Sequence, residues 1–363
     1  MRVKPTVTVV THFPSPYQVE LFNEVESQRP GCLQVFYLYS RVPSRSWSGV
    51  AMSHPHCFLD LRVDGMSVSE QAMAEAELVV FNYYNDPRAA RLIRMRAATN
   101  RAWCFWGERP GYRFPWLARL ARLGRLAALR SSNRPIWGIG SWAVDGYRRE
   151  FGSTRSYLNL PYYSNLERFQ AVRAAFRRDD FTFLFSGSLS HRKGVDLLAR
   201  AFRRLAAENP RVRLILMGEG AMERDLRTTL AACDRVQWAG FKDWADLPAM
   251  YEAAHVLCVP SRYDGWGLVV PEGLAAGLPV IATDRTGAAH DLLAPGKNGL
   301  LVSANDWFAL YGAMKAMAQL DEAGWSTLSA RARDSVAAHS LVSGAARFLA
   351  AADQARLAAG AEA

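Results

Sequence analysis

Short apolar runs alternate along the chain with segments in which apolar residues recur at helical spacing. The run at residues 6–11, for example, ends in the proline-rich loop 12–17, and helical spacing begins at Val19. Strands that alternate with helices form parallel sheets covered on both faces, so the pattern predicts an α/β fold. The predicted strands of the first half are 6–11, 33–39, 78–81, 102–106, 136–139 and 156–160, and those of the second half begin at 181, 213, 256, 280 and 299.

The chain of 363 residues is long enough for two domains. A polar segment, residues 166–180, lies between two strand runs and is the predicted linker. We therefore expect domains at residues 1–170 and 171–339, followed by a helical segment at 340–363.

The composition, 50% apolar and 21% charged, excludes general disorder. The sequence contains no run of eighteen uncharged apolar residues, and its first residues lead straight into a strand. We therefore expect neither a transmembrane helix nor a signal peptide, and a cytoplasmic protein. The five cysteines have neither paired nor metal-ligand spacing and are expected to be reduced thiols.

The net charge of +10 is confined to one half of the chain. Residues 1–177 hold 24 Lys and Arg against 13 Asp and Glu, whereas residues 178–363 hold 20 against 21. Such a field attracts nucleic acid, anionic lipid or a phosphorylated substrate, and composition does not choose among them.

Part of this charge follows a helical pattern in residues 113–130, where leucines and Arg119, Arg122 and Arg125 each recur every three residues. Adjacent apolar and basic stripes are typical of a helix that lies on an anionic membrane surface. The alternative is that the leucines pack on a sheet and the arginines are simply solvated.

The stretch 259–283 combines an apolar strand, a glycine-punctuated loop, a short helix and a second strand. Pro271 suits the first position of that helix and Glu272 its first turn, and Asp264 precedes Glu272 by eight positions. We expect the backbone N–H groups of residues 267–269 to face a ligand, because glycines open the loop. Amides suit a diphosphate, and a carboxylate suits a ribose diol. The residues expected to form this pocket are Asp264, Gly265, Gly267, Leu268, Val269 and Glu272.

A less specific interpretation is that Gly265 and Gly267 belong to an ordinary turn and that Glu272 only complements the helix dipole, worth about 0.3–1 kcal/mol. A second loop argues for a ligand site, because Arg192 and Lys193 stand just before the predicted helix 195–207. Basic side chains at such a position form an anion site.

Together these stretches resemble glycosyltransferase family 4, the glycosyl transferases group 1, whose signature is E-x(7)-E. Asp264 stands at the first Glu of the signature and Glu272 at the second. The family pattern G-R-L-x(3)-K-G is met by Gly187, Leu189, Lys193 and Gly194. Ser188 occupies the place of the arginine, and Arg192 is the candidate to supply its charge.

Two further positions follow from the resemblance. Gly218 matches a strand that ends in G-x-G, and Phe241 lies where relatives line the base pocket, although an ordinary core phenylalanine fits equally well. In the first half, Glu108 stands where many members carry a histidine that faces the donor sugar. The alternative is that Glu108 belongs to a surface turn closed by Pro110 and Gly111.

The resemblance implies a GT-B fold: two Rossmann-like domains that face each other across a cleft, with the C-terminal helix crossing back to the first. It implies an acceptor-binding N-terminal domain and a nucleotide-sugar-binding C-terminal domain. The loop 12–17 lacks G-x-G-x-x-G, which disfavours a dinucleotide-dependent dehydrogenase.

The expected activity is that of a retaining, metal-independent glycosyltransferase without a cofactor. A nucleotide-diphosphate sugar would serve as donor, and a lipid-linked or cell-surface saccharide as acceptor. The catalytic candidates are Asp264, Glu108 and Lys193. Alternatives are a nucleotide-sugar epimerase, a phosphorylase and a basic nucleic-acid-binding protein, although no nucleic-acid-binding motif occurs.

Overall fold

The structure is a computed structural model that describes residues 5–42, 50–61, 64–99, 101–110, 124, 126–243 and 246–361. The chain forms two units. The first unit comprises Met1–Ser164 and Leu341–Ala363, and the second comprises Asn165–Ser340. The basic stripe of Arg119, Arg122 and Arg125 lies outside the described residues.

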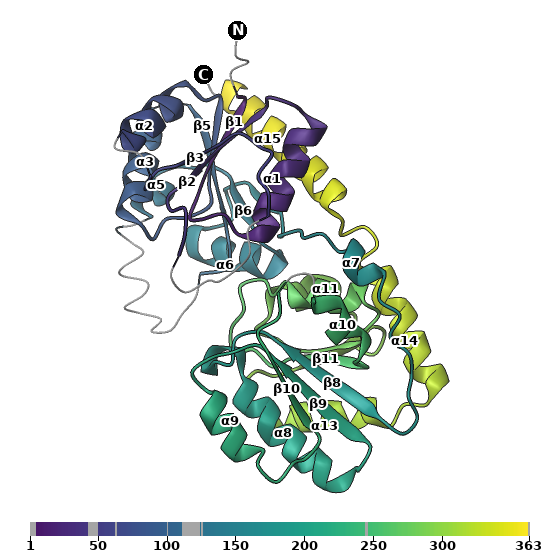
Figure 1. The fold of residues 1–363 in the computed structure, drawn as a ribbon. Coiled ribbons are helices and arrows are strands. Elements are labelled where there is room, and N and C mark those ends of the chain that lie inside the picture. The colour runs from purple at the N-terminus through teal and green to yellow at the C-terminus, as the bar shows by residue number, and fades with distance from the viewer. Residues whose placement is uncertain are drawn as a thin grey trace. The chain divides into compact units, whose positions relative to one another are not determined.

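A parallel seven-stranded sheet forms the centre of the first unit (Figure 1). Val9 lies opposite Val35 on one side and Val80 on the other. The strand order is β3-β2-β1-β4-β5-β6-β7. The strands are β1 (Val7–Thr11), β2 (Leu33–Tyr37), β3 (His56–Phe58), β4 (Leu78–Phe81), β5 (Ala102–Gly107), β6 (Ile136–Gly138) and β7 (Tyr157–Asn159).

The sequence pattern missed only β3 among these strands. It has three residues, lies at the edge of the sheet and begins with an exposed histidine, so it contains no continuous apolar run.

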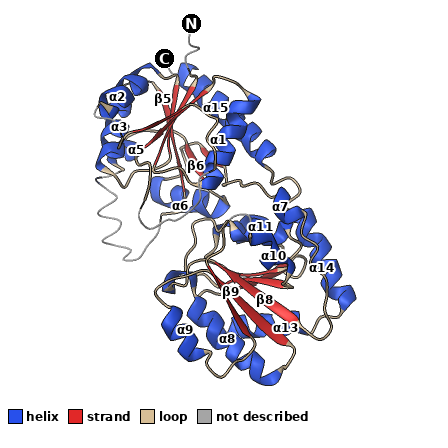
Figure 2. Ribbon diagram, viewed as in Figure 1, coloured by secondary structure: helices blue, strands red, loops and turns tan. Residues whose placement is uncertain are grey.

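Helices cover both faces of this sheet (Figure 2). Leu92, Leu129 and Tyr147 belong to one core, so the helices that carry them share one face. The helices α1 and α15 pack against each other (Figure 1). The helices of the first unit are α1 (Pro16–Gln28), α2 (Gly65–Glu75), α3 (Pro87–Ala97), α5 (Ala127–Arg130), α6 (Ser141–Phe151) and α15 (Leu341–Ala361).

The C-terminal helix α15 returns to the first unit, as predicted. Phe348 is fully buried, and its ring centroid lies 6.3 Å from that of Phe22 and 5.8 Å from that of Trp106. Arg29 donates two hydrogen bonds of 2.9 Å to the Asp353 carboxylate. An aromatic contact and a bidentate ion pair therefore fix the helix.

The second unit contains a parallel six-stranded sheet in the order β10-β9-β8-β11-β12-β13. Its strands are β8 (Phe181–Ser186), β9 (Val212–Met217), β10 (Val236–Gly240), β11 (Val256–Val259), β12 (Val280–Thr283) and β13 (Gly299–Val302). Its helices are α7 (Glu167–Gln170), the 3-10 turn η1 (His191–Lys193), α8 (Val195–Glu208), α9 (Glu223–Thr229), α10 (Leu247–Glu252), α11 (Val269–Ala275), α12 (Gly287–Leu292), α13 (Trp307–Ala318) and α14 (Glu322–Ser335). These elements confirm the predicted α/β pattern.

The predicted linker differs from the observed division, which falls between Ser164 and Asn165. The segment after it belongs to the second unit, because Leu166 and Phe169 are buried there. The ring centroid of Phe169 lies 4.9 Å from that of Tyr251. The charged residues around position 178 concealed these two apolar anchors in the sequence.

Both sheets have a point where the strand order reverses. In the first unit the chain winds outward from β1 in one direction and then starts again at β4, on the other side of β1. In the second unit the same reversal lies between β8 and β11. Open α/β sheets bind ligands at the carboxyl ends of the strands at such a point. The fold therefore marks one candidate site in each unit.

Truncation of Phe348 tests how strongly α15 is held. Phe348→Ala should lower the free energy of unfolding by about 3–5 kcal/mol, because a large buried ring leaves a cavity. Leu357→Ala on the same helix is the matched control, since Leu357 is 76% exposed. Urea denaturation measures both variants, and equal stabilities would contradict the assigned packing of α15.

Candidate functional site

The loop after β8 approaches the end of β11 very closely in the second unit. A Cβ atom on Gly194, whose φ is +67°, would lie 1.9 Å from the carbonyl oxygen of Pro260. A Cβ atom on Gly218 would lie 2.0 Å from the carbonyl oxygen of Gly187. Only glycine permits these approaches, so the glycines bring the loops after β8, β9 and β11 together.

Arg262 joins these loops through its guanidinium group. It donates hydrogen bonds of 2.6 and 2.7 Å to the two carboxylate oxygens of Asp196 in the first turn of α8. It also donates to the carbonyl oxygen of His191 at 2.7 Å and to Oδ1 of Asn305 at 2.8 Å. Burial raises the pKa of Asp196, but the hydrogen bonds and the charge of Arg262, together with a backbone hydrogen bond and the nearby His191, hold this pKa below its ordinary value.

The backbone of Arg262 completes the same connection, because its N–H donates to the carbonyl oxygen of Arg192 at 2.9 Å. The turn that contains Arg192 and Lys193 is therefore fixed relative to the loop that contains Asp264.

Lys193 and Asp264, 71 residues apart, form an ion pair between Nζ and Oδ2. Oδ1 of Asp264 lies 3.7 Å from Nη1 of Arg192, which also donates to the carbonyl oxygen of Tyr263 at 3.0 Å. The side chains of Lys193 and Asp264 are largely buried, whereas that of Arg192 is about half exposed. The structure thus brings together two basic groups and one carboxylate at the switch point of the second sheet.

The second predicted carboxylate, Glu272, is 4% exposed and lies in the first turn of α11. Tyr251 donates a hydrogen bond of 3.0 Å to Oε2 of Glu272. Burial raises the pKa of Tyr251 well above its ordinary value, and the neighbouring Glu272 raises it further. Tyr251 therefore stays protonated and orients the carboxylate.

The helix α11 begins at Val269, two residues before the predicted entry at Pro271. The first N–H groups of a helix have no partner within the helix. Gly267 has a φ of +90°, and a Cβ atom there would lie 3.3 Å from Oδ2 of Asp264. A Cβ atom on Gly287 would lie 2.2 Å from the carbonyl oxygen of Gly265. The backbone at Gly267 therefore passes close to the carboxylate of Asp264.

The other predicted donor-binding residues lie at the ends of β8, β9 and β10. Ser188 is exposed, and its Oγ lies 3.1 Å from that of Ser190. Phe241 is 46% exposed, so the alternative that it is a core residue is wrong. Its N–H donates to Oε1 of Glu219 at 3.4 Å.

Glu108 lies in the first unit at the end of β5, and its side chain is exposed. Tyr147 donates to its carbonyl oxygen at 2.7 Å. The next residue, Arg109, donates to the carbonyl oxygen of Trp142 at 2.8 Å. The Arg109 guanidinium lies 4.4 Å from the centroid of the Trp142 ring. The backbone of Glu108 and the side chain of Arg109 thus both contact α6.

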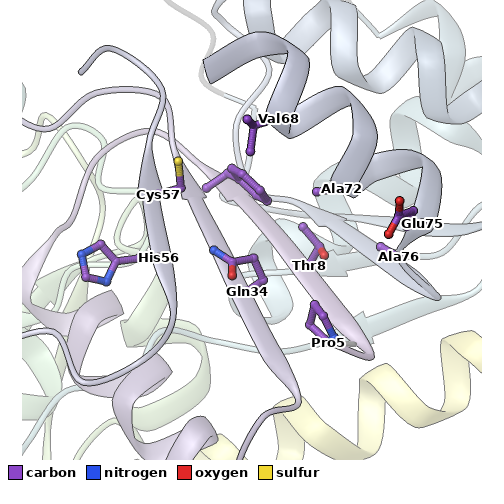
Figure 3. A pocket seen from close by; sticks show the side chains of 10 residues that line it. Pro5, Thr8, Gln34, His56, Cys57, Val68, Ala72, Glu75 and Ala76 are labelled. Atoms are coloured by element: carbon purple, nitrogen blue, oxygen red, sulfur yellow. The ribbon is translucent and has the colours of Figure 1, made fainter. Parts of the chain in front are cut away.

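The first unit also contains a cavity of about 390 Å³ between α2 and strands β1, β2 and β3 (Figure 3). It includes no predicted site residue. In the described part of the chain, no cluster of three or more His, Cys, Asp or Glu side chains could hold a metal ion. Among the same residues, no helix is long and apolar enough to span a membrane.

Residues 168–324 match the family model of the glycosyl transferases group 1. The second unit belongs to this family. The chain is also 34% identical over 174 residues to EpsD of Bacillus subtilis strain 168, which covers 44% of each chain. It is 31% identical over 140 residues to the lipopolysaccharide core biosynthesis mannosyltransferase LpsB of Rhizobium meliloti, which covers 36% of this chain and 39% of LpsB.

These matches to curated glycosyltransferases thus span only about two fifths of the relatives' lengths. Solved structures extend the likeness to the whole fold. The structure of HepE from Anabaena with UDP and glucose superposes with a TM-score of 0.72 at 15% identity and covers 96% of this chain and 99% of HepE. Sucrose-phosphate synthase from Thermosynechococcus elongatus gives a TM-score of 0.76 at 20% identity and covers 97% and 99%. The fold is GT-B, as the resemblance implied.

The sequence interpretation missed Arg262, Asp196 and Tyr251. Arg262 lies inside the stretch 259–283, between two predicted strands. An arginine at that position was the available signal. Tyr251 gave no signal, because its partner lies 21 residues away on a different helix.

Replacement of Arg262 tests whether its guanidinium group connects the loops. Arg262→Lys should lower the free energy of unfolding by about 1.5–3 kcal/mol, because one ammonium group does not reproduce the fork of hydrogen bonds to Asp196. Arg285→Lys is the matched control, since Arg285 is exposed in the next loop. Urea denaturation compares them, and equal losses would mean that Arg262 does not fix the loops.

Proposed function

We propose that the chain is a retaining glycosyltransferase that moves a sugar from a nucleotide-diphosphate sugar to an acceptor hydroxyl. The observation that supports this proposal most is the cluster of Lys193, Arg192 and Asp264 at the switch point of a unit that belongs to the group 1 glycosyltransferases. Glu272 on α11 adds a second carboxylate with a fixed orientation.

The donor would bind through three groups. Glu272, oriented by Tyr251, would accept hydrogen bonds from the ribose diol. Lys193, Arg192 and the N–H groups of residues 267–269 would bind the diphosphate. Phe241, nearly half exposed after β10, would contact the base. Gly187, Ser188 and Gly218 would line the site through their backbone.

The chemical step would depend on charge stabilisation. Negative charge develops on the departing diphosphate, and Lys193 and Arg192 would stabilise it more strongly in the transition state than in the ground state. The acceptor hydroxyl would attack the anomeric carbon on the face from which the diphosphate leaves, and a phosphate oxygen would take its proton. This route retains the configuration without a protein nucleophile and without a metal.

A covalent route would require a carboxylate nucleophile, for which Asp264 and Glu108 are the candidates. The two carboxylate oxygens of Asp264 face Lys193 and Arg192, which lowers its nucleophilicity. That environment favours a role for Asp264 in orienting a donor sugar hydroxyl beside the cations.

The proposed acceptor is a cell-surface or lipid-linked saccharide. One relative, LpsB, is a lipopolysaccharide core biosynthesis mannosyltransferase. Arg119, Arg122 and Arg125 would hold the protein on the inner face of an anionic membrane, because each basic residue near such a surface contributes about 1 kcal/mol. Leu126 and Leu129, at the end of the same stretch, pack in the core of the first unit instead. The donor would be bound by the second unit and the acceptor by the first.

Removal of the Glu272 carboxylate tests donor binding. Glu272→Ala should weaken binding of UDP or GDP by about 1.5–3 kcal/mol, the worth of a hydrogen bond to a charged group. Isothermal titration calorimetry measures the loss, and Glu252→Ala, outside the site, is the control. Unchanged affinity for both nucleotides would show that Glu272 does not bind the ribose.

Removal of the Lys193 amine tests the chemical step. Lys193→Ala should lower kcat more than it weakens donor affinity, because charge on the diphosphate increases in the transition state. Lys297→Ala, an exposed lysine of the same unit, is the control. Steady-state rates of donor turnover provide the comparison, and proportionate losses in kcat and donor affinity would argue against this role.

A further inference from the structure

Aromatic side chains gather at the carboxyl edge of the first sheet, just after β1, β2 and β4. The rings of His12 and Tyr83 are stacked, with centroids 4.1 Å apart and planes inclined by 7°. Tyr39 meets His12 edge to face at 5.4 Å. All three side chains are partly exposed. We call these three residues the aromatic cluster.

Hydrogen bonds fix the loops that carry the aromatic cluster. The N–H of Tyr39 donates to the carbonyl oxygen of His12 at 2.9 Å. Asn82, directly before Tyr83, accepts from Gln18 at 2.6 Å and donates to the carbonyl oxygen of Trp106 at 2.8 Å. The rings are therefore held before any ligand arrives, which reduces the ordering cost of binding.

Polar groups adjoin the aromatic cluster. The hydroxyl of Tyr39 donates to Oδ2 of Asp86 at 2.7 Å. The guanidinium of Arg88 lies 4.4 Å from the centroid of the Tyr39 ring, and its Nε donates to Oδ1 of Asp86 at 3.4 Å. The Arg88 side chain is 27% exposed, and the described residues offer its Nη groups no hydrogen-bond acceptor. The Nη donors of Arg88 thus lie beside the aromatic cluster.

This combination suits a sugar ring better than other ligands. The C–H face of a sugar packs on aromatic rings, whose faces carry partial negative charge, and its hydroxyls hydrogen-bond to planar polar groups. Asp86 offsets the charge of Arg88, so the group lacks the excess positive charge that a phosphate site needs. A purely apolar chain would leave the Arg88 donors without acceptors.

We propose that the aromatic cluster, with Arg88, binds the acceptor through the face of its terminal sugar ring. The inference rests on the proposed glycosyl transfer and adds to it the part of the acceptor that is recognised. It applies equally to a free oligosaccharide and to a lipid-linked one. The position at the β1–β4 switch point supports it, because open α/β sheets bind ligands at the carboxyl ends of the strands at such a point.

The test compares Tyr83→Ala with Tyr83→Phe. The probes are octyl glycosides of glucose, galactose, mannose and N-acetylglucosamine, each in free form and in anionic vesicles. Tyr83→Ala should raise the acceptor KM about tenfold, because stacking area is lost. Tyr83→Phe should stay within about twofold, since it keeps the ring. The donor KM and donor hydrolysis should not change in either variant.

Two further variants keep the test decisive if Tyr83→Ala does not fold. Arg88→Ala should also raise the acceptor KM severalfold and leave the donor KM unchanged. Tyr84→Ala is the matched control, because Tyr84 turns toward Phe105 of the core, with ring centroids 5.7 Å apart. The comparison of free with vesicle-borne glycosides shows what is recognised. An increase in the acceptor KM with both forms supports recognition of the sugar itself.

An acceptor KM that both Tyr83→Ala and Arg88→Ala leave unchanged would overturn the inference, as would transfer to none of the glycosides while donor hydrolysis persists. Absence of both donor binding and hydrolysis in the wild-type protein would refute the proposed function instead. The two failures are therefore distinguishable.

Discussion

The bidentate contact between Arg262 and Asp196 organises the candidate donor site of the second unit. Parallel strands end at one edge of a sheet, but their loops do not by themselves adopt a fixed relative position. Arg262 supplies that position, because one guanidinium group binds α8, the turn before it and the loop before α13. A hydrogen bond from an arginine to a carboxylate is strong and directional. The pairing of Lys193 with Asp264 follows from this arrangement.

The loops at the switch points of the two sheets carry different kinds of side chain. In the second unit, glycines such as Gly194 allow the backbones of neighbouring loops to approach each other closely, and charged side chains lie between these loops. In the first unit, the loops at the switch point carry aromatic rings that stack on one another. Charges suit a diphosphate and rings suit a sugar face, so one fold presents two kinds of chemistry.

The sequence predicted the second sheet well, because strands buried on both faces appear as continuous apolar runs. The strands that begin at 181 and 280 are almost wholly buried and begin where predicted. The edge strand β13 also begins at 299 as predicted, although its Leu301 is exposed. The edge strand β3 escaped prediction, since pairing with β2 rather than composition makes it a strand. The start of α11 was misplaced by two residues, because proline is tolerated throughout the first turn and not only at its first position.

The site was predictable only as far as local spacing extends. Asp264, Glu272 and Lys193 could be named because each lies in a short pattern with glycines at fixed offsets. The residues that fix their positions could not be named. Tyr251 and Asp196 reach the site through the winding of the sheet, and no local signal encodes a contact over 21 or 66 residues. The exposure of Phe241 is likewise decided by tertiary packing.

A crystal structure of the full chain with bound UDP or GDP would test the central claim most directly. The account predicts the diphosphate within about 3 Å of Nζ of Lys193 and of the N–H groups of residues 267–269, with the ribose hydroxyls on Glu272. A nucleotide bound at another edge of the second sheet, or a ribose turned away from Glu272, would contradict it.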